Sequence, residues 1–316
     1  MKKAPTLLAI SLLALLSLLP IASAQWSGIQ YQYANGVAIL NNDEIGIRVS
    51  ALNQVPHFQW WNLTSPGSDY HVQFLRIFEA NDSNSDEIFT PGEDHIVGQS
   101  FSLPSTNWEF SGFLEEHQND VITAVHFNYS NTDAFPPQGP SFNPATEPMS
   151  DELSIQIRVH FYLTTPQQFK FDVAISKWNW THDDSVLVFQ FAVVQSEHGQ
   201  YDGGEEPSEI IHTGNRFTFG HAYMEYAQNA FAENGTHQVQ VRGSHGPDTG
   251  AQEGKFVYLT FEHFEGDFDY DPFLGIVGSD STTIWDDLGI DYNQLLLFAG
   301  GFSLVVLVIM GVRARH

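Results

Sequence analysis

The sequence of 316 residues contains no cysteine and few basic residues: 12 Lys and Arg stand against 38 Asp and Glu, for a formal net charge of −26. The missing cysteine excludes a disulfide framework, a thiolate zinc site, a cysteine-ligated iron–sulfur cluster and a cysteine nucleophile. The shortage of Lys and Arg argues strongly against nucleic acid as a partner, because phosphate binding relies on these residues. Hydrophobic residues make up 42% of the chain, which is enough for a core and argues against global disorder.

Residues 1–24 have the features of a secretory signal peptide. Lys2 and Lys3 form a charged start, Leu7 to Leu19 is apolar, and Ala22-Ser23-Ala24 is a small-residue cleavage site. The apolar stretch is short for a membrane span. We therefore expect a cleaved signal peptide, the alternative being an uncleaved N-terminal anchor.

A second apolar segment, residues 295–312, contains 18 residues without a charge. At about 1.5 Å per helical residue it reaches across roughly 27 Å, which suits the hydrocarbon core of a bilayer. Arg313 and Arg315 follow it directly and favour a cytoplasmic C-terminus. The sequence thus predicts a single-pass membrane protein that contacts the membrane through 295–312. An acidic stalk over 280–294 precedes the span, and a tail of residues 313–316 follows it.

The segment between these ends, residues 25–294, is more acidic than the chain as a whole. Four of the 12 basic residues, Lys2, Lys3, Arg313 and Arg315, lie in the terminal segments, and no acidic residue does. Such a surface repels polyanions and attracts divalent cations or cationic partners. The other interpretation is that the charge serves only solubility.

Alternating apolar and polar residues predict β-strands through most of the chain. Residues 153–163 and 169–175 alternate strictly and are joined by a polar link with a proline, which indicates a hairpin with one buried face. Residues 186–194 (VLVFQFAVV) are nearly all apolar, as in a strand covered on both faces. No convincing helical stripe occurs between the ends. We therefore predict an all-β fold, a β-sandwich-type domain with long loops, with further strands at 37–40, 45–49, 72–78, 121–127, 217–219, 239–241 and 256–261.

The β-rich segment, residues 25–279, is predicted to be one extracellular domain. Residues 134–149 carry five prolines, so they form either a long loop or a linker between two domains. Residues 197–210 and 243–254 are rich in glycine and acids and are expected to be loops.

Residues 82–93 (DSNSDEIFTPGE) have the spacing of a calcium-binding loop. Asp82, Asn84 and Asp86 offer oxygen atoms at positions 1, 3 and 5, and Glu93 stands at position 12. Glu87 replaces the usual glycine at position 6, and the flanking segments resemble strands instead of helices. The prediction is a structural Ca²⁺ site, with an acidic surface turn as the alternative.

Fourteen histidines are present, without the short spacings of a metal site. The nearest group is Glu197-His198, His212 and His221, which three strands or loops would have to bring together. Ser244-His245 and Asp248 are too close in sequence for a catalytic triad, and no G-x-S-x-G occurs. An acidic cluster after the 256–261 strand is expected to be solvated, with cation binding as the alternative: Glu262, Glu265, Asp267, Asp269 and Asp271.

Two aromatic pairs raise the possibility of stacking on sugar rings: Trp60-Trp61, and Trp178 with Trp180. The alternative for both is packing in the core. Five Asn-x-Ser/Thr sequons fit an exported, glycosylated surface, and their asparagines are Asn62, Asn81, Asn128, Asn179 and Asn234.

The whole plan of the chain resembles archaeal membrane-anchored surface proteins: a signal peptide, an acidic cysteine-free β-domain with sequons, a C-terminal span and a two-arginine tail. The resemblance is one of class and supplies no functional residues. It implies a non-enzymatic binding, adhesion or surface-layer module at the cell membrane. The alternatives are an extracytoplasmic hydrolase or carbohydrate-binding protein, and a solute- or metal-binding receptor. No catalytic residue is predicted, and Ca²⁺ is the one cofactor considered.

Overall fold

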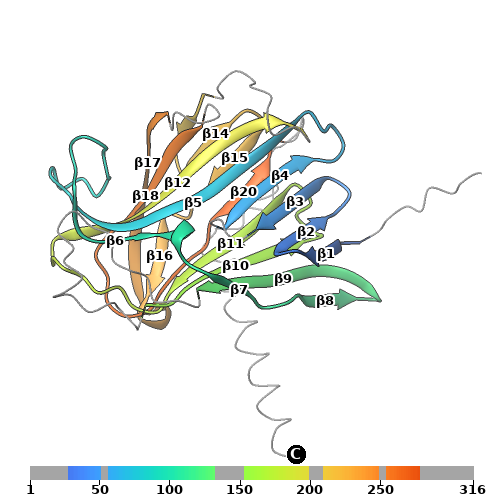
Figure 1. Cartoon of the computed structure of the whole chain (residues 1–316), viewed down its shortest axis with the longest axis horizontal. Coiled ribbons are helices and arrows are strands. Elements are labelled where there is room, and N and C mark those ends of the chain that lie inside the picture. Colours follow the sequence, from blue (N-terminus) through green and yellow to red (C-terminus); the bar gives the residue numbers. More distant parts are fainter. Residues whose placement is uncertain (1–27, 51–55, 132–152, 199–208, 249–253, 278–316) are drawn as a thin grey trace, which may run out of the picture.

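The computed structural model describes residues 28–50, 56–131, 153–198, 209–248 and 254–277 (Figure 1). Among these residues, no helix has the length and apolar character needed to cross a membrane. The predicted signal peptide, the proline-rich segment 134–149, the stalk, the 295–312 span and the tail fall outside the described residues.

The described part of the chain is all-β, as predicted, and every strand pairing in it is antiparallel. Two short 3-10 turns, η1 (Leu103–Ser105) and η2 (Glu233–Gly235), interrupt the strands. The strands are β1 (Gln30–Ala34), β2 (Val37–Asn41), β3 (Ile45–Ser50), β4 (His57–Asn62), β5 (Ser68–Asn81), β6 (Ile96–Ser102), β7 (Trp108–Phe110), β8 (Leu114–Gln118), β9 (Val121–Asn131), β10 (Ile155–Tyr162), β11 (Gln168–Ile175), β12 (Ser185–Glu197), β13 (Ile211–Thr213), β14 (Arg216–Phe219), β15 (Ala222–Glu225), β16 (Asn229–Ala232), β17 (His237–Asp248), β18 (Lys255–Phe261), β19 (Phe268–Tyr270) and β20 (Phe273–Ile276).

The first sheet has the order β1-β2-β3-β4-β5-β12-β18-β17. Strand β6 pairs with the second half of β5, on the edge that β4 occupies along the first half. The pairing of β5 with β12 runs from Ser68↔Glu197 to Asn81↔Ser185 and forms the centre of the sheet.

The second sheet is built around β9, β10 and β11. Strands β7 and β8 both pair with β9, β9 pairs with β10, and β10 pairs with β11. The far side of β11 pairs with β20 and then with β19. From there the sheet continues through β15, β14 and β13 on one branch, and through β16 on the other. Strand β17 joins the two sheets, because its first half pairs with β16 and its second half with β18.

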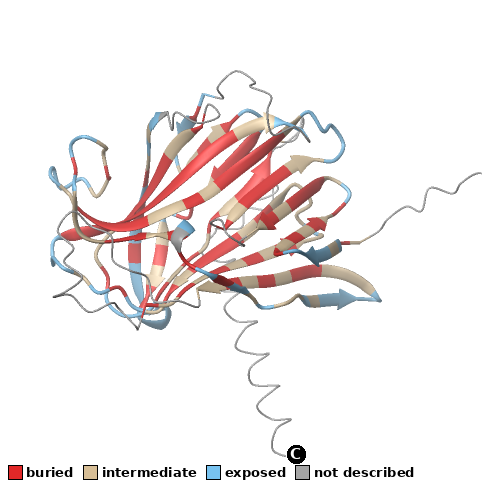
Figure 2. Cartoon of the chain, viewed as in Figure 1, coloured by how far each residue is buried: buried red, intermediate tan, exposed pale blue. Residues whose placement is uncertain are grey.

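Buried residues run along the strands of both sheets (Figure 2), and many of those in the core are aromatic. Phe58 of β4 contacts Phe74 of β5 and Phe171 of β11 edge-on, with ring centroids 5.2 and 5.1 Å apart. Trp60 is fully buried and donates its indole N–H to the carbonyl of Gly275 in β20, at 3.1 Å. These contacts fix the two sheets face to face, because each ring packs against the opposite sheet.

Strand β12 is buried on both faces from Ser185 to Val194, as its sequence predicts. Its inner face packs in the core, and Val186 and Val188 of its outer face cluster with Phe89 of the loop that joins β5 to β6. Phe89 of that loop packs on Phe78 and Tyr258, with ring centroids 5.2 and 5.0 Å away. Its backbone N–H donates to Thr260 Oγ1 at 2.9 Å, which fixes the loop on the sheet.

Candidate functional site

The outer face of the second sheet carries an array of ionisable side chains. Along β10, Ile157, Val159 and Phe161 are buried in the core. The residues between them, Arg158, His160 and Tyr162, therefore point to the opposite face. The same alternation in β11 places Lys170 and Asp172 on that face, and β9 adds His126, the register partner of His160.

His126 and His160 join β9 to β10. Their Nδ1 atoms are 2.7 Å apart. The other nitrogen of each ring faces a carboxylate: His160 Nε2 is 3.0 Å from Asp172 Oδ2, and His126 Nε2 is 3.2 Å from Glu116 Oε1. Tyr162 covers the pair, with ring centroids 5.5 Å from His126 and 6.4 Å from His160.

Lys170 bridges two of the acidic groups. Its Nζ lies 2.9 Å from Asp172 Oδ1 and 2.9 Å from Asp271 Oδ2. The side chains keep limited exposure, 16% for Lys170, 10% for Asp172 and 21% for Asp271. Water therefore reaches the bridge but does not surround it, so the charges interact more strongly than on an open surface.

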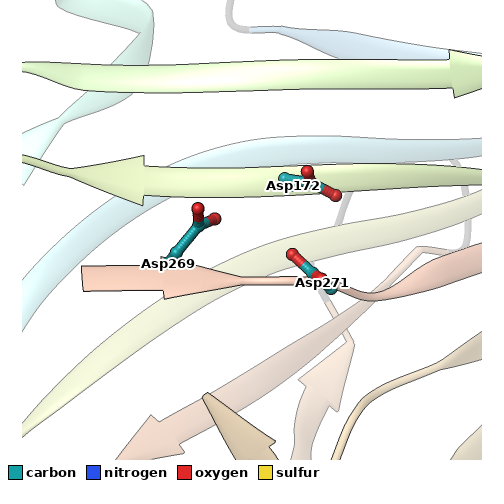
Figure 3. A group of neighbouring side chains, drawn as sticks. All are labelled: Asp172, Asp269 and Asp271. Carbon is teal, nitrogen blue, oxygen red and sulfur yellow. The ribbon is translucent and has the colours of Figure 1, made fainter. Parts of the chain in front are cut away.

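Asp269 of β19 completes the cluster. Its Oδ2 accepts a hydrogen bond from Arg158 Nη1 at 3.0 Å. Asp172, Asp269 and Asp271 each place a carboxylate oxygen within 4.8 Å of the others (Figure 3). Among the described residues, this is the one group of three acidic or histidine side chains close enough to share a ligand. Lys170 already occupies the space between two of them.

The environment gives these carboxylates opposite pKa shifts. For Asp271, burial and the negative charge of Asp172 raise the pKa to about 6, against the opposing effect of Lys170. For Asp172, burial acts to raise the pKa, but the hydrogen bond from His160 and the charge of Lys170 outweigh it and lower the pKa to about 2. Burial also raises the pKa of Asp269 and of Tyr162. One carboxyl of the cluster thus exchanges a proton near pH 6 while its neighbour remains ionised, a division typical of acid–base sites.

The predicted calcium loop forms a compact turn between two strands. Asp82 Oδ1 and Oδ2 accept hydrogen bonds from the backbone N–H groups of Asp86 and Glu87, at 3.2 and 2.8 Å. Asn84 Oδ1 also accepts from the Asp86 N–H, at 3.2 Å. Glu87 has a positive φ of 60°, so the position where calcium loops carry glycine has the left-handed conformation here too. The loop backbone itself uses the predicted ligand oxygens, and calcium binding stays a prediction.

The residue at position 12 of that loop, Glu93, is exposed. Its neighbour Asp94 is buried and holds the loop closed by accepting from the N–H groups of Ser83 and Thr90, at 2.9 and 2.7 Å. Asp82, Asp86 and Glu93 are not among the described carboxylates that lie within 4.8 Å of one another.

The predicted histidine group is spread over separate surroundings. His198 Nδ1 is 2.5 Å from Asp69 Oδ1, and His212 Nε2 is 3.0 Å from the hydroxyl of Tyr226. His221 contacts Tyr70 through its backbone N–H. In the part of the chain that the structure describes, these three histidines do not form a metal-binding group. Ser244 donates its hydroxyl to the Phe89 carbonyl at 2.6 Å, in keeping with the absence of a triad there.

The tryptophan pairs mostly serve packing. Trp60 and Trp178 are buried, and Trp178 lies edge-on to Phe101 at 5.3 Å. Trp180 donates its indole N–H to the Phe264 carbonyl at 2.7 Å and stacks on His263 at 4.2 Å. Trp61 is half-buried, with its ring 5.6 Å from His198.

The five sequon asparagines lie at the surface or partly buried: Asn179 and Asn234 are exposed, whereas Asn62, Asn81 and Asn128 are half-buried. Asn128 is on β9, two residues from His126, and its Nδ2 donates to Ser130 Oγ at 3.1 Å. A glycan at Asn128 would therefore cover part of the histidine pair. Glycosylation of these asparagines stays a prediction.

Sequence reasoning found only part of this cluster. It singled out Asp269 and Asp271 as members of an acidic run, but it did not connect them with His126, His160, Lys170 or Asp172. The useful signal was present in the alternation of β10 and β11, since charged and aromatic polar residues occupy consecutive outward positions. Only the pairing of β11 with β19 brings the acidic run beside them.

No protein-family model matches the chain, and no curated protein matches it in sequence. Solved structures that resemble it include the following three. A mutant of the heparan sulfate lyase HepC from Pedobacter heparinus has 9% identity and a TM-score of 0.41, over 81% of this chain and 37% of the lyase. Two structures of a heparinase III, one with methylated lysines, have 9% and 11% identity and TM-scores of 0.36 and 0.34. They are matched over 78% and 80% of this chain, and over 36% and 35% of their own length.

These comparisons overturn the predicted non-enzymatic binding, adhesion or surface-layer role, because the similar solved structures are enzymes named for a polysaccharide. The hypothesis that takes its place is the alternative, an extracytoplasmic hydrolase or carbohydrate-binding protein. The chain spans little more than a third of these enzymes, and at such TM-scores no residue of theirs transfers to it. The functional assignment therefore depends on the side chains of the outer face.

Proposed function

We propose that the chain is an extracytoplasmic glycoside hydrolase that works under mildly acidic conditions, with its site on the outer face of β9, β10, β11 and β19. One observation carries the proposal. Asp172 and Asp271 lie on this face with oxygen atoms within 4.8 Å, and their surroundings give them pKa values of about 2 and about 6.

Glycoside hydrolysis needs two such carboxyl groups. One must carry a proton for the oxygen of the leaving sugar, and the other must stay ionised to stabilise the positive charge that develops on the sugar ring. Asp271 suits the first role and Asp172 the second. In retaining enzymes the two groups stand about 5 Å apart, so the spacing here favours retention of configuration at the anomeric carbon.

In this proposal, the Lys170 ammonium must move before cleavage can occur. Its positive charge lowers the pKa of Asp271 in the free protein. A sugar that enters between the two carboxylates must move the Lys170 ammonium aside. The pKa of Asp271 then rises further, because an opposing charge has been removed. Substrate binding would thus protonate the acid at the moment it is needed.

The substrate class follows from charge and from the ring-bearing side chains. Tyr162, His126 and His160 form an aromatic wall beside the carboxylates, on which a sugar ring can stack. A formal net charge of −26 repels polyanions. A neutral polysaccharide is therefore the substrate class that this surface favours.

The test is release of new reducing ends by the full chain from neutral polysaccharides such as amylose, xylan and galactomannan, with heparan sulfate as an anionic comparison, between pH 4 and 8. We expect cleavage of a neutral polymer that declines as the pH rises through about 6, where Asp271 loses its proton. Asp271→Asn and Asp172→Asn should each lower the rate by about a hundredfold or more, as removal of a general acid does.

Glu265→Gln is the matched control, because Glu265 is 79% exposed and its ion pair with His263 is long, at 3.9 Å. It should leave cleavage unchanged. Binding of a polysaccharide without any new reducing ends would indicate a carbohydrate-binding protein instead of a hydrolase. Equal rates for the wild type and Asp271→Asn would refute the assignment of the acid.

The location and the anchor of the protein rest on its sequence alone. Residues 1–24 and 295–312 support an extracytoplasmic site held at the cell membrane. Fractionation of cells that express the full chain tests this: recovery in the membrane fraction with the β-domain open to added protease is expected, and recovery in the cytoplasm would contradict it.

A further inference from the structure

The outer face of the first sheet contains a serine and two histidines in a single hydrogen-bonded line. Ser196 Oγ of β12 lies 2.9 Å from His71 Nε2 of β5, and His71 Nδ1 lies 3.0 Å from His57 Nε2 of β4. These groups are on the opposite sheet from the carboxylates of the proposed hydrolase site, and no part of that proposal uses them.

The strand register explains how they meet. Asp69 pairs with Ser196, and His71 pairs with Gln59, which is two residues after His57. The line thus runs diagonally across three neighbouring strands on one face. Backbone pairing on both sides of β5 fixes the three side chains, so the arrangement belongs to the rigid part of the sheet.

We propose that Ser196, His71 and His57 form a second site, an acyl-ester hydrolase triad with Ser196 as nucleophile. The two hydrogen bonds fit the pair of ring tautomers in which the Ser196 hydroxyl donates to His71 Nε2 and His71 Nδ1–H donates to His57 Nε2. This is the order that a nucleophile, a base and an orienting group require.

Both rings are uncharged in the resting site. Burial lowers the pKa of His71 to about 4, with Asp69 opposing the shift and Arg48 adding to it. Burial, the charge of His71 and the charge of Arg48 lower the pKa of His57 to about 3. At neutral pH the lone pair of His71 Nε2 is therefore open to a hydrogen bond from the Ser196 hydroxyl.

The nucleophile remains reachable. Ser196 is half-exposed, whereas His71 is only 6% exposed beneath it. Trp61 and His198, with ring centroids 5.6 Å apart, stand beside Asp69, the register partner of Ser196. They supply a flat, partly apolar wall for the substrate.

The reaction balances without a cofactor. The Ser196 oxygen bonds to the ester carbonyl carbon, and its proton moves to His71 Nε2. The bond from that carbon to the alcohol oxygen then breaks, and His71 returns the proton to the leaving alcohol. Water, deprotonated by His71, then bonds to the acyl carbonyl carbon. The bond from that carbon to the Ser196 oxygen breaks, His71 returns the proton to this oxygen, and the acid is released.

The test treats the full chain with a fluorophosphonate reagent, which phosphonylates activated serines, and maps the adduct by mass spectrometry. Hydrolysis of p-nitrophenyl acetate is followed in parallel. We expect one adduct, on Ser196, that disappears in Ser196→Ala. His71→Gln should slow labelling by about a hundredfold or more, as loss of a general base does.

Two further variants separate chemistry from folding. Ser244→Ala removes a serine whose hydroxyl donates to the Phe89 carbonyl, and it should label as the wild type does. His57→Gln keeps a side-chain oxygen that can accept from His71 Nδ1, and it should retain more activity than His57→Ala at the same melting temperature. No adduct on folded wild type, an adduct elsewhere, or equal labelling of His71→Gln would overturn the proposal.

Discussion

His126 and His160 face each other through their Nδ1 atoms, 2.7 Å apart, across the paired strands β9 and β10. Each ring also faces a carboxylate through Nε2. This line contains three hydrogen bonds, one between the two rings and one from each ring to its carboxylate. Each bond needs one proton. Two neutral imidazoles carry two ring protons between them, so the line is complete when the pair holds one positive charge.

This arrangement predicts how His126 responds when its partner is removed. Burial and the charge of His160 lower the pKa of His126. His160→Gln removes the second cause, so the pKa of His126 should rise. NMR titration of the His126 ring measures the change, and His117→Gln, at an exposed histidine bonded to Glu115, provides the control. A pKa of His126 that stays the same or falls in His160→Gln would contradict the proposed coupling.

The buried histidines of the first sheet predict a loss of stability in acid. The pKa of His71 is lowered to about 4 from an ordinary 6.5. Below pH 6.5 the unfolded chain binds a proton that the folded chain refuses, so stability is lost as the pH falls toward 4. The shift corresponds to at most about 3 kcal/mol. Urea unfolding at pH 7 and pH 4.5 should show a smaller loss in His71→Gln than in the wild type; an equal loss in both would assign the acid sensitivity elsewhere.

Removal of the buried Glu79 carboxylate should lower the stability of the fold. Its side chain is fully buried and accepts from the N–H groups of Thr181 and His182 and from the Ser185 hydroxyl, at 2.7 to 3.1 Å. Glu79→Ala leaves the N–H groups of Thr181 and His182 without this acceptor and should lower the free energy of unfolding by about 3–5 kcal/mol. Glu265→Ala, at an exposed site, should change it by less than about 0.5 kcal/mol.

A second substitution examines the same contact from the other side. A Cβ at Gly98 would lie 2.0 Å from Glu79 Oε2, so Gly98→Ala must displace the carboxylate. In chemical denaturation, the free energy of unfolding of Gly98→Ala should be close to that of Glu79→Ala. Full stability of Gly98→Ala would mean that the carboxylate can move without losing its donors.

The calcium hypothesis predicts a rise in melting temperature when millimolar Ca²⁺ is added to chelator-treated protein. The double variant Asp82→Ala, Glu93→Ala should lose that rise. The expected size is modest, because a ligand at a hundred times its dissociation constant stabilises by about 2.7 kcal/mol. Calorimetry on the wild type decides the matter: no heat and no shift would leave the loop as a turn fixed by Asp82, Asp94 and Phe89.

Local pattern sufficed for the strands that define the core. The alternation in β10 and β11 and the apolar run of β12 predicted both their existence and their buried faces, because each depends on residues a few positions apart. Ten strands were not predicted: β1, β4, β6, β7, β8, β13, β15, β16, β19 and β20. Most are too short to show a clear alternation, β1, β8 and β13 are mostly exposed, and β4 buries the polar Gln59.

The candidate site could not be predicted from local sequence pattern. Asp271 is far in sequence from Asp172, and only the pairing of β11 with β19 and β20 brings them together. The same holds for Ser196 and His71, which meet through the pairing of β5 with β12. Spacing motifs concern residues within one loop, as in the calcium prediction for residues 82–93. These clusters depend on strand order, which local spacing does not reveal.

The pairing of β5 with β12 also has a consequence for the folding of the chain. These strands are adjacent in the sheet, yet more than a hundred residues separate Ser68 from Glu197 in the chain. Loop closure over such a distance precedes the contacts that stabilise it, so the central pair forms slowly. Until β5 and the Phe89 loop cover it, the segment VLVFQFAVV remains exposed as an apolar, uncharged strand. The stretch that stabilises the native sheet is thus the one most prone to intermolecular association during synthesis.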